Sequence, residues 1–360
     1  MCSSDLVARS ATIRKNLPMG KKAVAVSDVY YELYRGHTLL VSLAGKQAYS
    51  DEEYQAIMDD VAHLVRRKIN ILLVSNEQLE EMSCSLIDRF GSQINEIILI
   101  NHDGGVRDKR GWIAPLLTGS SIEKILAGQH PDFRAVTKDL RGQLTQVLSL
   151  LPKVGKISLI SPTGLKGEIV RWRGSGTMCI DSKQLNLSPL QDSEMPIFRE
   201  VYEAYVAENK FRRRSERELQ TVGRCHQILR AKNSPVAGFS LVEHTAPWLE
   251  LSVWWAQYKG DGFGTRVLDA AKQQAAARGR RLFALSTEDD AIEILTRCGF
   301  KNLGRISTIA SRQSYPPDLQ DLPDLPGSVR NYDTSTRDPY ILIEGSPARP
   351  NDGGGETATR

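Results

Sequence analysis

The 360-residue sequence lacks several patterns that would assign it to a class at once. No apolar stretch approaches the roughly 20 residues of a membrane-spanning helix, and the first residues lack the apolar core and cleavage site of a secretory signal. The five cysteines form no C-x-x-C pair, and the six histidines form no cluster with metal-ligand spacing. We therefore expect a cytoplasmic protein without a metal site. The basic first residues leave an organelle-targeting segment open as an alternative.

The charge balance does not indicate a nucleic-acid-binding or membrane protein. The net charge is only +4, with 41% hydrophobic and 25% charged residues. These values are typical of a globular protein, and the length allows two domains with separate cores. We expect neither nucleic acid nor membrane as a partner.

The first half of the chain alternates strand and helix signals. Continuous apolar runs at 38–45, 69–75, 95–101 and 156–161 are typical of buried parallel strands. A capping box of Ser50 and Glu53 predicts a helix to about Arg67, and further helices are expected at 76–90 and 137–151. This pattern predicts an α/β domain with a mostly parallel sheet.

After residue 196 the pattern changes. A second capping box, Ser215 with Glu218, predicts a helix that carries Leu219, Val222, Ile228 and Leu229 on one side. The other predicted elements are helices at 197–208 and 265–278 and strands at 236–244, 249–256, 281–287 and 337–343. We predict the following organisation: a flexible N-terminus (1–25), a first domain (26–184), a linker (185–196), a second domain (197–345) and a disordered tail (346–360).

The segment "QYKGDGFGTRVL" (257–268) has three glycines in five positions and predicts a loop that approaches an anion. It lacks the Lys-Thr or Lys-Ser pair of a P-loop, and it follows two adjacent strands rather than opening a βαβ dinucleotide fold. The order Lys259-x-x-Gly262-x-Gly264 instead resembles the cofactor loop of the GNAT acetyltransferase superfamily. In that superfamily, amides of this loop and of the following helix hold the pyrophosphate of acetyl-CoA.

Further segments make the resemblance narrower. "YRGHTLLVSLAGK" (34–46), "EIVRWRGSGTM" (168–178), "RRSERELQ" (213–220) and "RLFALST" (281–287) resemble segments of the bacterial N-acetylglutamate synthases in the same order. The resemblance covers most of residues 34–345. It implies a shortened amino-acid-kinase-like domain followed by a GNAT α+β domain.

The first domain also departs from that family. The stretch at 76–95 is short, and Ala44 stands where a kinase would have the first glycine of a Gly-Gly pair. Phosphoryl transfer needs such positioning groups. We therefore expect no kinase activity, and the family's arginine regulation of this domain stays open.

The resemblance assigns roles to particular residues. Glu250 would remove the proton from the attacking ammonium, with a pKa raised by the neighbouring Trp254 and Trp255, and Ser286 would donate to the leaving thiolate. The alternatives are a solvent-facing glutamate and a serine that only satisfies backbone at the strand end. The cofactor residues implied are Val253, through its amide, and the loop Lys259, Gly260, Asp261, Gly262, Phe263 and Gly264.

The acceptor would be held through its carboxylates. Arg213 or Arg214, and Arg337, match substrate-binding arginines of the family, whose planar fork suits a carboxylate. Where relatives carry a serine two residues after the last arginine, this chain has Pro339, which donates no hydrogen bond.

The implied function is N-acetylation of the α-amino group of L-glutamate by acetyl-CoA, the first step of arginine synthesis, in a homo-oligomer. Pro339 keeps a second interpretation open, a related enzyme acting on another small amino acid or amine. A third interpretation is a non-catalytic subunit that senses acetyl-CoA or an amino acid.

Overall fold

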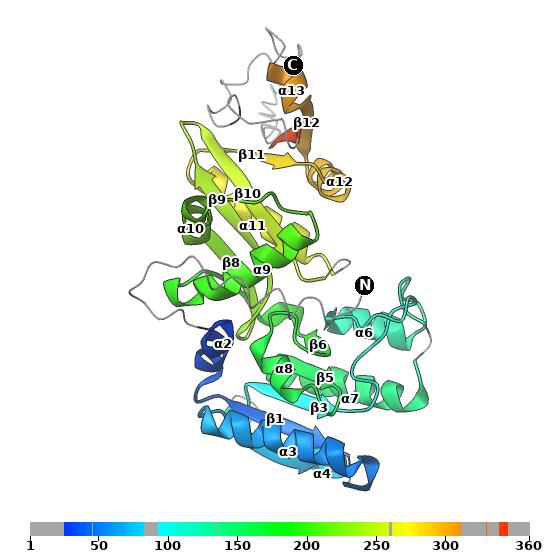
Figure 1. Cartoon of the computed structure of the whole chain (residues 1–360). Coiled ribbons are helices and arrows are strands. Elements are labelled where there is room, and N and C mark those ends of the chain that lie inside the picture. Colours follow the sequence, from blue (N-terminus) through cyan, green and yellow to red (C-terminus); the bar gives the residue numbers. More distant parts are fainter. Residues whose placement is uncertain are drawn as a thin grey trace, which may run out of the picture.

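The computed structural model describes residues 25–44, 46–82, 93–134, 136–258, 261–310, 329 and 338–344. The chain builds two α/β units, one around a six-stranded sheet and one around a seven-stranded sheet (Figure 1). This confirms the predicted fold class. The N-terminus (1–24) and the tail (346–360), for which we predicted flexibility, lie outside the described residues.

The first sheet has the strand order β2-β1-β3-β5-β6-β4. Strands β2, β1, β3 and β5 run parallel, and β6 is antiparallel to β5. The strands are β1 (Thr38–Leu43), β2 (Asn70–Ser75), β3 (Glu96–Ile100), β4 (Leu116–Thr118), β5 (Lys156–Ile160) and β6 (Thr177–Ile180).

Two groups of helices cover this sheet. Leu39, Val41 and Ile98 pack on one face beneath α2, α3 and α8, while Leu40, Ile97 and Leu99 pack on the other beneath α6 and α7. The helices are α2 (Val26–Tyr34), α3 (Asp51–Arg66), α4 (Asn76–Met82), α6 (Gly119–Leu126), α7 (Lys138–Val154) and α8 (Leu165–Val170), with a short η2 (Lys46–Ala48) and η4 (Ser182–Gln184). The predicted box at Ser50 and Glu53 caps α3.

The second sheet has the order β12-β13-β11-β10-β9-β8-β7. Its strands are β7 (Leu185–Pro189), β8 (His226–Ala231), β9 (Ser234–Glu243), β10 (Trp248–Ala256), β11 (Arg281–Ser286), β12 (Phe300–Arg305) and β13 (Tyr340–Glu344). Its helices are η5 (Asp192–Glu194), α9 (Met195–Ala207), α10 (Glu216–Arg224), α11 (Phe263–Ala277), α12 (Asp289–Arg297) and α13 (Ile306–Ala310). Helix α11 packs on the apolar face that includes Phe239, Leu249 and Leu282.

Two sequence predictions in this unit were wrong. The helix that starts after Ser215 ends at Arg224, so Ile228 and Leu229 lie in strand β8 instead of on its apolar side. Ile228 and Leu229 are apolar and fit a strand as well as a helix, and the pairing with β9 decides between the two structures. Residues 185–189, predicted as part of a linker, form β7 at the sheet edge and pair with β8.

The two units share buried surface. Val29, Tyr30 and Trp172 of the first unit pack in one cluster with Phe198 and Tyr202 of the second. Leu116, Met178 and Ile180 join the core beneath α11.

A buried polar cluster links the units as well. Lys156 Nζ donates to Glu96 Oε2 at 2.7 Å, to the Tyr34 hydroxyl at 2.8 Å and to Ser234 Oγ of the second unit at 2.8 Å. Burial of both apolar and ionic groups indicates that the units form one folded body.

None of the helices in the described part of the chain combines the length and apolarity needed to cross a bilayer.

Candidate active site

The candidate site begins where two neighbouring strands separate. Strand β10 pairs with β11 from Trp248 to Leu251 only, but it pairs with β9 as far as Ala256. Strand β11 continues to Ser286 against β13. The two strands therefore diverge beyond Leu251, and backbone along the diverging edges is left for a ligand.

A bulge in β10 marks this point. Leu251 pairs with Leu241 and Val253 with Ser240, so Ser252 is the extra residue. A bulge of this kind bends a strand and interrupts its ladder, which is a common arrangement beside active sites. Ser252, Glu250 and Trp254 are partly exposed and line the cavity, whereas Val253 is 2% exposed and packs in the core behind it. Only the backbone of Val253 is left for the predicted contact to a cofactor.

A cavity of about 1140 Å³ occupies the gap. Its walls come from β10, from the end of β11, from α12 and from the α9–α10 loop, and the first unit adds a further wall. That size is slightly above the range of about 300–1,000 Å³ that is typical of small-molecule sites, so the cavity has room for a large ligand.

The glycine loop closes one end of this cavity. Gly262 has a φ of 73° and is the N-cap of α11, and no side chain caps that helix. A Cβ at Gly262 would meet nothing within 4 Å, so the left-handed φ, and not lack of space, favours glycine here. The first amides of α11 have no capping side chain and are available for an anion. Phe263 is 2% exposed, so it contributes backbone only.

Glycine is favoured at position 264 for a different reason. A Cβ there would lie 3.3 Å from the Trp254 ring, and Trp254 Nε1 donates to the Gly264 carbonyl at 2.9 Å. The indole thus ties the loop to the diverging strand. Lys259 and Gly260 lie outside the described residues.

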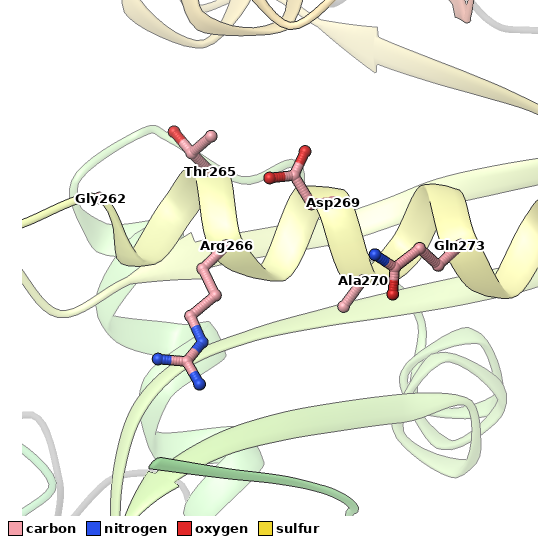
Figure 2. Close-up of a pocket in the computed structure, with 6 residues that line it drawn as sticks. All are labelled: Gly262, Thr265, Arg266, Asp269, Ala270 and Gln273. Atoms are coloured by element: carbon pink, nitrogen blue, oxygen red, sulfur yellow. The ribbon is translucent and has the colours of Figure 1, made fainter. Parts of the chain in front are cut away.

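A second hollow, of about 590 Å³, follows the outer side of α11 from Gly262 to Gln273. In Figure 2, Thr265 and Asp269 point to one side of the helix and Arg266 to the other. Arg266 donates to the Ser182 carbonyl at 2.8 Å. Its guanidinium therefore fastens α11 to the segment before β7.

Asp261, predicted as a cofactor residue, turns away from the cavity. Its Oδ1 accepts a hydrogen bond from the Thr118 hydroxyl at 3.3 Å and another from the Ser121 hydroxyl, both at the start of α6. Oδ2 is buried with no partner among the described residues. The side chain of Asp261 thus fastens the glycine loop to the first unit.

Glu250 lies near the other end of the cavity. It is 14% exposed, and His244 Nε2 lies 2.9 Å from its Oε2 across the β9–β10 turn. Arg214 lies 3.9 Å from Oε1. Burial raises the pKa of Glu250, but the His244 hydrogen bond and the Arg214 charge outweigh burial, so the pKa is lowered. The raised pKa that we predicted from the tryptophans is therefore wrong, because the sequence neighbours do not include the two partners that matter.

Of the two adjacent arginines, the structure brings only Arg214 to the site. Its side chain is 5% exposed, and it donates to the Ser252 carbonyl at 3.0 Å and to Ser252 Oγ at 2.7 Å. Arg213 is exposed and does not line the cavity. Arg337 lies outside the described residues.

Ser286 lines the opposite wall at the end of β11. Its hydroxyl accepts from the Glu288 amide at 3.1 Å, which is the backbone role we kept open, and it donates a longer hydrogen bond to the Glu288 carbonyl at 3.4 Å. Pro339 and the buried Leu295 also line the cavity.

Sequence reasoning missed several residues that contact the site. His244 and Ser252 carried no motif of their own. The first unit contributes Arg173 and Trp112, the latter with 73% of its surface exposed. Only the packing of the two units brings these side chains to the cavity.

Among the described residues, no group of three or more histidine, cysteine, aspartate or glutamate side chains is placed to hold a metal.

Comparisons with known proteins give structural likeness only. No known protein-family profile matches the chain, and no curated protein does. The chain is similar to a crystal structure of N-acetylglutamate synthase from Neisseria gonorrhoeae complexed with coenzyme A and L-arginine (13% identity, TM-score 0.49, covering 89% of this chain and 97% of that chain). It is also similar to a structure of the same enzyme complexed with coenzyme A and N-acetyl-glutamate (13% identity, TM-score 0.40, covering 90% of this chain and 99% of that chain). It is also similar to an acetyltransferase of the GNAT family from Staphylococcus aureus (12% identity, TM-score 0.32, covering 44% of this chain and 98% of that chain).

Proposed function

We propose that this chain is an acetyl-CoA-dependent amino-acid N-acetyltransferase, with L-glutamate as the acceptor. The observation that carries the proposal is the gap between β10 and β11, with the uncapped N-terminus of α11 at one end and the partly buried Glu250 toward the other. The helix end supplies an anion site for the pyrophosphate. The diverging strand edges supply amides for an extended, amide-containing arm.

Transfer of the acetyl group then proceeds directly in a ternary complex. The amine nitrogen attacks the thioester carbonyl carbon, a C–N bond forms, and the C–S bond breaks. Glu250, ionised at neutral pH because its pKa is lowered, accepts the ammonium proton through a water molecule, and His244 lies within hydrogen-bond distance to share it. The Ser286 hydroxyl donates a hydrogen bond to the thiolate that leaves, and the second proton lost by the nitrogen ends on that thiolate. Arg214 keeps Glu250 and the Ser252 bulge in place.

With glutamate as the acceptor, the product is N-acetylglutamate, the first intermediate of arginine synthesis. Arginine is then a regulator to test. The proposal includes a cytoplasmic homo-oligomer. Pro339 in the cavity wall supports a second candidate, the same transfer to another small amino acid or amine, because proline donates no hydrogen bond to a carboxylate. A subunit that binds acetyl-CoA without turnover is the non-enzymatic alternative.

The proposed roles of Glu250 and Ser286 are tested by substitution. We expect Glu250→Gln to lower kcat by about 10²- to 10⁴-fold, because the proton acceptor is lost, and Ser286→Ala to lower kcat by about tenfold or more. The acetyl-CoA KM should change little in both variants. Glu243→Gln, at an exposed glutamate on the same hairpin, is the matched control and should keep wild-type turnover. A Glu250→Gln variant with wild-type rates at neutral and alkaline pH would remove Glu250 from the mechanism.

A further inference from the structure

Arg173 is a residue of the first unit that lines the cavity of the second. It follows α8 and lies beside Tyr205, Glu208 and Lys210, which belong to α9 and the loop after it. Its guanidinium carbon lies 4.4 Å from the centroid of the Trp172 ring, and its Nη2 lies 3.2 Å from Glu208 Oε1. The stacked ring and the carboxylate hold the planar fork at the cavity wall.

Cations outnumber the carboxylate at this point. Lys210 Nζ lies 2.5 Å from Glu208 Oε2, so Arg173 and Lys210 share one negative charge. Burial raises the pKa of Glu208, but Lys210 and Arg173 outweigh burial and lower it, so the carboxylate is ionised at neutral pH. Arg173, Lys210 and Glu208 together therefore carry a net charge of +1. Arg173 Nε is in addition buried with no hydrogen-bond partner among the described residues.

The place of this charge along β10 indicates which part of a ligand it meets. The Trp172 carbonyl accepts from Gln257 Nε2 at 3.1 Å, and the Tyr205 hydroxyl donates to the Ala256 carbonyl at 2.7 Å. These contacts lie at the end of β10 that leads into the glycine loop. Glu250 lies six residues earlier, about 20 Å away along an extended strand. A small amino acid whose ammonium is near Glu250 does not span that distance.

We propose that Arg173, assisted by Lys210, binds a phosphate of the acetyl-CoA cofactor, so that the first unit forms part of the cofactor site. This rests on the proposed function. A guanidinium matches the oxygens of a phosphate with two parallel N–H donors, and the Arg173 side chain is 41% exposed at the cavity wall, so its outer donors can reach a ligand. The pyrophosphate and the 3′-phosphate share this chemistry, and the experiment separates them.

Direct binding of coenzyme A to the full-length protein, followed by calorimetry, tests the inference without requiring turnover. We expect Arg173→Ala to raise the Kd of coenzyme A about 10- to 100-fold, as for a lost hydrogen-bonded ion pair. Arg173→Lys, which keeps the charge and loses the fork, should fall between Ala and wild type. Arg171→Ala removes an exposed arginine that does not line the cavity and should bind as wild type does.

3′-Dephospho-coenzyme A distinguishes the two phosphates. If Arg173 meets the 3′-phosphate, the substitution leaves the Kd of the dephospho ligand unchanged. If Arg173 meets the pyrophosphate, both ligands weaken by the same factor. An unchanged coenzyme A Kd in Arg173→Ala would overturn the inference, and so would a raised acceptor KM with unchanged coenzyme A binding. Failure of the wild type to bind coenzyme A would instead overturn the proposed function, and binding without acetyl transfer would support its non-enzymatic alternative.

Discussion

His226 makes the stability of the second unit depend on pH. The ring is 1% exposed, with Nδ1 2.7 Å from Ser240 Oγ, and Nε2 accepts from Trp255 Nε1 at 3.1 Å. Burial, followed by the charge of Arg230, lowers the pKa of His226 from 6.5 to about 3. The neutral ring that these bonds require is therefore the form present in the folded protein at neutral pH.

The direction of the pH effect follows from the two pKa values. In the unfolded chain His226 takes up a proton below about pH 6.5, whereas the folded protein does not until about pH 3. Its contribution to stability is complete above pH 6.5 and is lost as the pH falls from 6.5 toward 3. Between pH 7 and pH 5 the expected loss is about 2 kcal/mol, which is RT times the natural logarithm of the ratio of the factor 1 + h/Ka of the unfolded-state imidazole at the two pH values, where h is the proton concentration.

Glu200 opposes this change. Burial, partly offset by Tyr30 and Arg171, raises the pKa of Glu200 from 4.5 to about 6, so the folded state takes up a proton first and gains about 1 kcal/mol between pH 7 and pH 5. The wild-type pH dependence therefore hides part of the His226 effect. A comparison with a variant that lacks the imidazole isolates it.

The assay is urea unfolding of the wild type and of His226→Gln at pH 7 and pH 5. The variant should be less stable at pH 7, because Ser240 and Trp255 lose their partner, but it should decline about 2 kcal/mol less than the wild type on going to pH 5. Because only the difference between the two pH values counts, a general destabilisation does not obscure the result. Equal declines in both proteins would refute a buried neutral imidazole.

Two further predictions concern the contacts between the units. Lys156→Met should lower the free energy of unfolding by about 3–5 kcal/mol, because it leaves Glu96 buried without its cation. Adding Glu96→Gln should recover part of the loss. An unchanged urea midpoint in Lys156→Met would contradict a stabilising role for the buried ion pair. The double variant Thr118→Val/Ser121→Ala should lower the free energy of unfolding by about 1–3 kcal/mol and weaken coenzyme A binding, because the Asp261 carboxylate loses both hydrogen-bond donors. Adding Asp261→Ala to this variant should restore stability. A triple variant no more stable than the double variant in the same urea assay would count against that tether.

Local patterns in the sequence predicted much of this fold. Both capping boxes form as expected, at Ser50 and Ser215, because the bonds that make them join residues three apart. Strand β8 was mistaken for a continued helix, because a short apolar run fits either structure until a partner strand is known. The edge strand β7 was predicted as part of a linker, because its sequence, LNLSP, contains polar residues and proline, and only its pairing with β8 identifies it as a strand.

The candidate site also combines features that the sequence predicted with features that only the structure shows. The glycine loop and Glu250 were predicted from the sequence, because the spacing of the glycines and the place of the glutamate on its strand match the family pattern. The lowered pKa of Glu250 depends on His244 and Arg214, which reach it from another strand end and another helix start. Asp261 looks like a cofactor residue in the sequence, and only the position of α6 shows that its carboxylate serves the contact between units.

The proposed activity is tested most directly by following acetyl-CoA consumption by the full-length protein against a panel of amino acids and amines, with and without arginine. We predict that L-glutamate is acetylated at rates well above those of the other acceptors, and that Glu250→Gln abolishes the signal while Glu243→Gln preserves it. Turnover with another compound and background with glutamate would move the function to the second candidate. Binding of acetyl-CoA without turnover of any acceptor would contradict the proposal that the chain is an enzyme.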